Sequence, residues 1–358
     1  MSENRCPYVL KPKVTNAIWG GDALVKRFGK PGDPNATLAE SWECWDENTV
    51  TNGPLAGRTL AQLRAELGSE LLGNIDPGEI FPILTKIIDA RDSLSVQVHP
   101  GDAYARRIEG QQNGKTECWY VLDAQPGAEI VLGWTVDTTR AEYERRVADG
   151  SLGEILRRVP AHPGDAFYLP AGTLHAIGAG IIIFETQQAS DLTYRIFDWN
   201  RVGANGKARE LHVQKAGDVL DYGRSTAGAI DPINYTLDGL HRTALIADPR
   251  FTVERLSIGG RTHTMSTQGR PMIFMALADA LEVRCADGGA MLEPYQTALV
   301  PAGAGEATLR GAGSDNAHVM FVTPPARADA MEEQLNTAGV SRDRIEAFLR
   351  QFASPQAG

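Results

Sequence analysis

Four polar side chains stand out because they interrupt segments that otherwise resemble buried strands: Gln97, His99, Glu117 and His175. Gln97 and His99 are two residues apart, so on one strand their side chains leave the same face. Burying such groups without partners would cost about 2–7 kcal/mol each. Two imidazoles and a carboxylate are the ligand set of an open catalytic zinc site, and an amide oxygen can complete it. The pattern favours a metal site, and the alternative is a set of separate structural or solvated side chains.

The elements expected to position these side chains are short strands separated by turns. Apolar runs and period-two alternation predict the strands, and Pro-Gly-Asp and Pro-Ala-Gly sequences predict turns between them. The strands are expected over 81–90, 94–99, 117–122, 130–134, 166–169, 174–177, 181–185 and 193–197. Strand, turn and strand at this spacing suit an antiparallel barrel or sandwich. If the strands line one barrel, the four polar side chains can converge inside it.

A second β-rich region begins near residue 235. Its strands are expected over 251–258, 271–277, 281–285, 297–300 and 318–322. The Pro-Ala-Gly turn that precedes His175 recurs before Glu306, which suggests two related barrels, the second without the histidine; chance is the alternative for so short a repeat. The tail over 326–352 has helical periodicity, with Ser341 as its expected N-cap.

Composition restricts the class of protein. A chain of 358 residues is long enough for two domains. Its net charge of −10 and lack of a basic cluster argue against nucleic acid, whereas an anionic small substrate needs only two or three local cations. None of the four cysteines lies in a CxxC pair, which favours reduced cytosolic thiols. The longest nearly apolar stretch, 176–184, is too short to span a bilayer. We expect a cytoplasmic protein with no membrane partner.

Several segments together resemble the type I mannose-6-phosphate isomerases, and above all their short bacterial branch. They are 95–100 (SVQVHP), 114–120 (GKTECWY), 170–176 (PAGTLHA) and 185–191 (ETQQASD) followed by Tyr194-Arg195. Trp19-Gly20-Gly21, Phe81-Pro82, Lys86 and 209–212 (RELH) fit the same family. The likeness extends from about residue 8 to 322 and is dense up to about 216. Gly101-Asp102, Trp199-Asn200-Arg201 and the tail beyond about 323 depart from the family pattern.

The resemblance implies a mainly β fold with two cupin-like antiparallel β-barrels or jelly rolls. Residues 1–230 would form a catalytic, metal-binding domain with helical insertions at about 59–70 and 139–159. Residues 235–325 would form a second cupin-like domain without metal, and 326–358 a helical tail. The insertions also have capping-box spacing, in Thr59 with Gln62, Thr139 with Glu142 and Ser151 with Glu154.

The resemblance also implies one divalent metal, expected to be Zn²⁺, held by Gln97, His99, Glu117 and His175. The expected reaction interconverts D-mannose 6-phosphate and D-fructose 6-phosphate through an enediol. Catalytic roles are expected for Arg195 and Lys115. The general base is left open among a metal-bound water, Lys115 with a lowered pKa, and His99 displaced from the metal.

The phosphate of a sugar phosphate needs cations, and the expected ones are Arg195 and Lys86. The alternative for Arg195 is a structural ion pair with Asp191 or Asp198. The chain is expected to be a monomer or a homodimer. Two other functions compete with the isomerase: a cupin metal-dependent oxidoreductase that uses iron, and a non-catalytic sugar-binding regulator.

Overall fold

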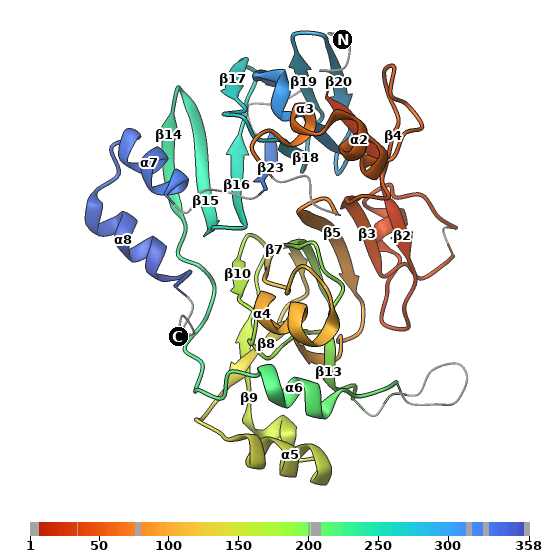
Figure 1. Ribbon diagram of the computed structural model, residues 1–358, viewed down its shortest axis with the longest axis vertical. Coiled ribbons are helices and arrows are strands. Elements are labelled where there is room, and N and C mark those ends of the chain that lie inside the picture. The colour runs from red at the N-terminus through yellow and green to blue at the C-terminus, as the bar shows by residue number, and fades with distance from the viewer. Residues whose placement is uncertain are drawn as a thin grey trace.

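The chain folds mainly into antiparallel β-sheets, as expected (Figure 1). The computed structural model describes residues 7–33, 35–75, 80–199, 201, 209–312, 317–324 and 329–353. Two pairs of sheets are stacked in the view of Figure 1, with the first barrel below the second.

The first barrel consists of two sheets that enclose an apolar core. The six-stranded sheet contains, in spatial order, β10 (Ala166–Leu169), β7 (Glu117–Ala124), β12 (Ile181–Gln188), β5 (Ile83–Ala90), β3 (Glu40–Cys44) and β2 (Lys13–Thr15). The five-stranded sheet contains β13 (Tyr194–Phe197), β6 (Val96–Val98), β11 (His175–Ile177), β8 (Glu129–Trp134) and β9 (Leu156–Pro160). Side chains such as Trp119, Ile130 and Ile183 fill the space between the two sheets.

The second barrel is built in the same way but takes strands from both ends of the chain. Its eight-stranded sheet contains β14 (Ile233–Leu237), β15 (Leu240–Asp248), β16 (Phe251–Ser257), β23 (His318–Thr323), β18 (Met272–Ala276), β21 (Thr297–Val300), β1 (Tyr8–Lys11) and β4 (Thr49–Val50). Its four-stranded sheet contains β17 (His263–Ser266), β22 (Glu306–Gly311), β19 (Leu281–Cys285) and β20 (Gly288–Leu292). The N-terminal strand β1 pairs with β21, so the start of the chain lies in the sheet of the second barrel.

The two barrels contain an equivalent pair of strands, each followed by a Pro-Ala-Gly turn. In the first barrel Glu117 is opposite Leu169, and a Pro-Ala-Gly turn follows the leucine. In the second barrel Met272 is opposite Val300, and the second Pro-Ala-Gly turn follows the valine. A methionine therefore stands where the first barrel has its carboxylate. That the second barrel holds no metal stays a prediction.

The largest apolar core lies between the two barrels. It contains Cys118 and Phe184 from the outer face of the six-stranded sheet, and Met275 and Val322 from the eight-stranded sheet. Because successive strand residues face opposite sides, Cys118 points away from the interior that its neighbour Glu117 enters. Cys118 is therefore a buried, free thiol of this core.

The helices cover the ends and sides of the barrels. They are α1 (Ala23–Lys26), α2 (Leu60–Leu67), α3 (Ser69–Leu72), α4 (Asp102–Tyr104) with the π-helix η1 (Ala105–Glu109), α5 (Arg140–Asp149), the 3₁₀-helices η2 (Leu152–Ile155) and η3 (Ala302–Ala304), and α6 (Val213–Val219). The predicted capping box at Thr59 and Gln62 is present, and Thr139 caps α5. The helix expected over 139–159 is shorter than predicted: Gly150 at φ 78° ends it, and residues 156–160 form strand β9 against β8.

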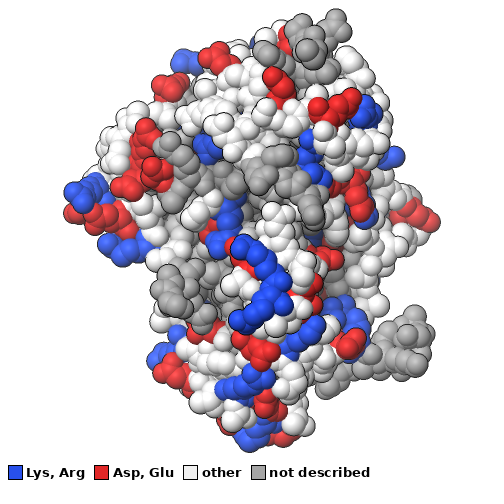
Figure 2. Space-filling model, in the orientation of Figure 1, with Lys and Arg blue, Asp and Glu red and all other residues white. Residues whose placement is uncertain are grey.

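The C-terminal tail forms α7 (Ala330–Thr337) and α8 (Arg342–Arg350) at the side of both barrels (Figure 1). The predicted N-cap Ser341 precedes α8 but makes no side-chain cap hydrogen bond. Phe352 packs edge-on against Tyr168 of the first barrel, with ring centroids 5.3 Å apart. On the face shown in Figure 2, charges of both signs are interspersed. Among the helices in the described ranges, none has the length and apolar character needed to cross a membrane.

Candidate metal centre

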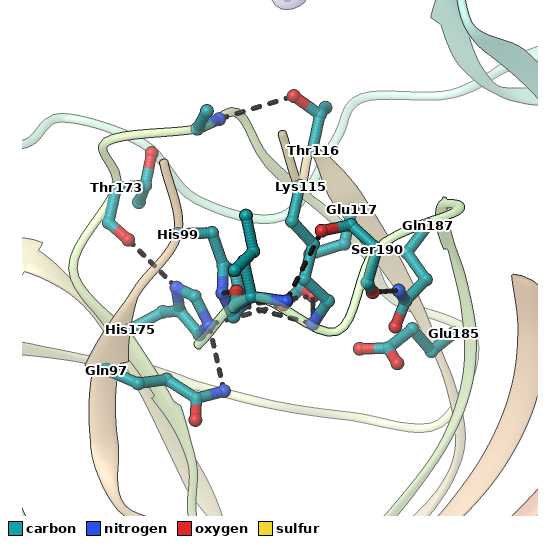
Figure 3. Close-up of polar contacts among 12 residues, drawn as sticks. Gln97, His99, Lys115, Thr116, Glu117, Thr173, His175, Glu185, Gln187 and Ser190 are labelled. Carbon is teal, nitrogen blue, oxygen red and sulfur yellow. Dashed lines mark hydrogen bonds and ion pairs between the residues drawn. The ribbon is translucent and has the colours of Figure 1, made fainter. Parts of the chain in front are cut away.

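The first barrel brings three of the predicted ligands together in its interior (Figure 3). His99 follows β6, Glu117 begins β7 and His175 begins β11. Their exposed fractions are 2%, 0% and 1%, and one ligand atom from each lies within 4.8 Å of the others. Residues far apart in the chain thus form one buried candidate metal site.

Both imidazoles present the same nitrogen to the centre. Nδ1 of His99 donates to the carbonyl of Leu192 at 2.7 Å, and Nδ1 of His175 donates to the carbonyl of Thr173 at 2.8 Å. A carbonyl oxygen only accepts, so the proton of each neutral ring is on Nδ1 and the lone pair is on Nε2. Orientation of an imidazole through its other nitrogen is typical of metal-ligating histidines.

The Glu117 carboxylate faces these lone pairs. Oε1 of Glu117 lies 3.2 Å from Nε2 of His175, and Oε2 lies 3.4 Å from Nε2 of His99. Among the described residues, Oε1 has no hydrogen-bond donor although it is buried. Lone pairs that meet at a buried point need a cation, and two imidazoles with a carboxylate are the donor set of a divalent metal. The residues present therefore fit such an ion.

Lys115 supplies a positive charge at the same point. Its Nζ lies 2.5 Å from Oε2 of Glu117 and 3.1 Å from Nε2 of His99. Burial and the Lys115 ammonium lower the pKa of His99 to about 3, and burial lowers the pKa of His175. Burial alone would raise the pKa of Glu117, but Lys115 and the two imidazoles outweigh it and hold that pKa well below its usual range. The imidazoles thus stay neutral and the carboxylate stays charged, as metal ligands must be.

Gln97 lies beside the three buried candidate ligands. It is paired with His175 across β6 and β11, and its Nε2 donates to Nε2 of His175 at 3.3 Å. Rotation of the amide by 180° would turn its oxygen toward the centre instead. The role of Gln97 as a fourth ligand stays a prediction.

Arg195 occupies the same row of the five-stranded sheet. It is directly opposite Gln97 across β13 and β6, and Gln97 is directly opposite His175. Cross-strand partners share a face, and neighbouring strands are about 4.8 Å apart. Arg195 therefore starts two strands, or about 10 Å, from His175 on the face that bears the candidate ligands.

The Arg195 guanidinium makes no ion pair among the residues that the structure describes. Nε donates to Oγ of Ser95 at 3.2 Å, and Nη1 to the carbonyl of Glu210 at 3.3 Å. Burial and the neighbouring Arg209 lower the pKa of Arg195. The alternative partner Asp198 instead accepts from Arg201 and Arg209.

Lys86 lies on the inner face of β5 and has two carboxylate neighbours. Its Nζ lies 3.3 Å from Oε2 of Glu185 and 3.4 Å from Oε2 of Glu40, and 5.1 Å from the ring centroid of Trp42. Burial lowers the pKa of Lys86, but Glu40, Glu185 and Glu117 outweigh it and leave that pKa raised. A role for Lys86 in phosphate binding stays a prediction, with both carboxylates competing for its charge.

Two carboxylates near the site were not among the predicted functional residues. Glu185 is 3% exposed and accepts from Nε1 of Trp119 at 3.0 Å, and Glu40 accepts from Nε1 of Trp42 at 2.7 Å. Alternation along β12 places Glu185 on the side of Ile183, inside the barrel. A charged residue on the inner face of a buried strand is the same signal that identified Glu117, so Glu185 could have been found.

The fold and the site define a class: a mainly β protein with a buried candidate metal centre next to a lysine, inside the first of two barrels. A family model described as "Phosphomannose isomerase type I, catalytic domain" matches residues 8–131. The chain is 42% identical over 265 residues to a mannose-6-phosphate isomerase of Streptococcus mutans, covering 73% of this chain and 82% of that relative. It is 39% identical over 315 residues to the mannose-6-phosphate isomerase ManA of Bacillus subtilis, covering 85% and 96%.

The crystal structure of mannose 6-phosphate isomerase from Bacillus subtilis superimposes with a TM-score of 0.80 at 33% sequence identity, covering 88% of this chain and 99% of that one. The chain belongs to the type I phosphomannose isomerase family. The resemblance in the sequence is therefore confirmed.

Proposed function

We propose that the chain is a metal-dependent aldose–ketose isomerase that interconverts D-mannose 6-phosphate and D-fructose 6-phosphate. The single observation that supports this most strongly is the buried meeting of His99, Glu117 and His175, with both Nε2 lone pairs facing the carboxylate. Membership of the family gives this site its reaction class. We propose that the reaction takes place in the cytoplasm.

The proposed metal is Zn²⁺, held by His99, Glu117 and His175 with Gln97 as the fourth ligand. Isomerisation moves a proton between C1 and C2 of the sugar, and the α-proton is too weakly acidic for an unaided side-chain base. A bound divalent metal supplies a Lewis acid that polarises the carbonyl and stabilises developing negative charge. The neutral imidazoles and the ionised carboxylate are already in the protonation states that this role requires.

Lys115 and Arg195 are the proposed catalytic residues of the chain itself. Lys115 holds a proton on Nζ at 2.5 Å from Glu117, inside the site, where it can stabilise or protonate an oxygen of the enediol. Arg195 lies on the face of the five-stranded sheet that bears His175, two strands or about 10 Å from it. A sugar phosphate bound by its carbonyl end at the ligands would direct its phosphate toward the Arg195 guanidinium.

The activity is tested by a coupled assay that follows fructose 6-phosphate formed from mannose 6-phosphate. We expect turnover that a chelator reduces by at least about 100-fold and that added Zn²⁺ restores, since a metal contributes several kcal/mol to the transition state. Full activity in protein shown by elemental analysis to be metal-free would contradict the proposal. Oxygen consumption without isomerisation would identify the oxidoreductase instead, and binding without turnover the regulator.

Arg195→Ala should lower kcat/KM for mannose 6-phosphate by about 100-fold, because a guanidinium that stabilises phosphate or enediolate charge is lost. The metal content should be unchanged, because the Arg195 side chain donates to Ser95 and Glu210 and not to a proposed ligand. Arg91→Ala, which removes an exposed guanidinium paired with Asp92, is the control and should match the unmodified protein. Normal kinetics in Arg195→Ala would remove Arg195 from the mechanism.

A further inference from the structure

The backbone on each side of Lys115 is held by a side chain from another part of the first barrel. The N–H of Gly114 donates to Oδ1 of Asp102 at 2.8 Å. The N–H of Thr116 donates to Oε1 of Gln188 at 2.9 Å, and this bond is buried. Asp102 begins α4 and Gln188 ends β12, so neither is a chain neighbour of the lysine. Two side-chain acceptors therefore bracket Lys115.

The two acceptors are joined to each other and to the turn that follows His99. Nε2 of Gln188 donates to Oδ1 of Asp102 at 3.0 Å. The N–H of Lys115 itself donates to the carbonyl of Pro100 at 2.9 Å. The two segments are in direct contact: a Cβ on Gly114 would lie 2.5 Å from that carbonyl oxygen. Residues 100–102, 114–116 and 188 thus form one hydrogen-bonded unit, which we call the Lys115 clamp.

The clamp determines where the lysine ammonium lies. A lysine side chain is a flexible stem with four methylene groups, so the position of Nζ depends on how firmly its backbone is held. Here Nζ must stay 2.5 Å from Glu117 and 3.1 Å from His99. His99 directly precedes the turn that the clamp contains, and Glu117 directly follows its other segment. A displacement of about 1 Å in such a site can cost about 100-fold in rate.

We propose that Asp102 and Gln188 are positioning residues that set the Lys115 ammonium against Glu117 and His99 for turnover. The inference rests on the proposed function, in which Lys115 is catalytic, and it assigns a role to Asp102, the acidic residue that follows Gly101. The second oxygen of Asp102 lies 3.9 Å from guanidinium nitrogens of Arg106 and Arg250. Those pairs are partly exposed and add little, so the clamp depends on Oδ1.

The test is a double-mutant cycle between the clamp and the lysine, with kcat, KM, metal content and melting temperature measured for each variant. Asp102→Ala should lower kcat by about 10- to 100-fold with unchanged metal content. Asp102→Asn retains an oxygen that can accept both bonds, and should stay within about threefold of the unmodified enzyme. In a Lys115→Ala background, Asp102→Ala should change kcat by less than about twofold, because the group that it positions is absent.

Asp165→Ala is the matched control. Asp165 accepts from the backbone N–H of His162 at 2.8 Å, and its side chain is 27% exposed against 30% for Asp102. Its loss should leave kcat unchanged. If Asp102→Ala is too unstable to purify, Gln188→Glu replaces it in the cycle: the acceptor for Thr116 stays, but the donor to Asp102 becomes a carboxylate that repels it.

Two outcomes overturn the inference. Equal fold losses from Asp102→Ala with and without Lys115 would mean that Asp102 acts independently of the lysine, and loss of metal would mean that it acts on the ligands. A Lys115→Ala variant with normal kcat is a different failure, because it would remove the catalytic role of the lysine and the proposal built on it. Isomerase activity itself is read from the unmodified enzyme, so these failures are distinguishable.

Discussion

Glu117→Gln is expected to abolish metal binding and to lower isomerase turnover by about 1000-fold or more. The substitution keeps the size of the side chain but removes the negative charge of the candidate ligand between His99 and His175. Loss of the several kcal/mol that a metal contributes to the transition state corresponds to at least this factor, at 1.4 kcal/mol for each tenfold. The measurements are metal content by elemental analysis and turnover of mannose 6-phosphate at saturating substrate.

The same substitution should also destabilise the metal-free protein. Lys115 is 5% exposed, and among the described residues its ion pair is with Glu117, so a neutral glutamine leaves a buried ammonium without that pair. Breaking a buried pair in this way costs about 3–5 kcal/mol, measurable by urea unfolding after chelation. Glu185→Gln is the matched control: it neutralises another buried carboxylate, 3% exposed, and should retain the metal. A full complement of metal in Glu117→Gln would refute the assigned site.

Lys115→Met should lower kcat by about 100- to 10 000-fold while the metal stays bound. Methionine fills most of the volume of the lysine stem, but it lacks the ammonium group. In the unmodified protein Nζ of that group lies 2.5 Å from Glu117 and 3.1 Å from His99. An acid–base group in position accounts for a factor of this size. The measurement is kcat with metal content determined on the same sample, together with the rate at which the C2 proton of the substrate exchanges with solvent.

A charge-retaining control separates the proton on Lys115 from its charge. Lys115→Arg keeps a cation but replaces a compact ammonium by a wider planar group that cannot give up its proton. If Lys115 transfers a proton, Lys115→Arg should be as slow as Lys115→Met; if it acts only through charge, part of the rate should return. Normal turnover and normal proton exchange in Lys115→Met would exclude the lysine from the reaction.

Much of the candidate site was predictable because its signals are local. Gln97 and His99 are two residues apart, and a strand places such residues on one face whatever the rest of the fold does. The same alternation separated Glu117, which enters the barrel, from Cys118, which joins the core between the barrels. The capping box at Thr59 is equally local and is present as predicted.

Other features depend on which distant segments meet, and local pattern does not contain that information. The pairing of β1 with β21 joins residues nearly three hundred positions apart, so the N-terminal strand completes the second barrel. Residues 156–160 lie at the end of the segment predicted to be helical. In the structure they pair with β8 and form a strand. Tertiary pairing outweighs weak local preference in both cases.

The sequence by itself determined the strand-rich fold, the family, and the residue types that meet at the candidate metal, because period-two patterns and motif spacing act over a few residues. Only the tertiary structure decided which charges are already neutralised. Asp198 forms ion pairs with Arg201 and Arg209, and Arg195 has no carboxylate partner among the described residues. Lys86, in contrast, lies within ion-pair distance of two carboxylates, those of Glu40 and Glu185. Such partnerships depend on distances of a few ångströms between strands far apart in the chain, because the strength of an ion pair falls with separation and rises with burial.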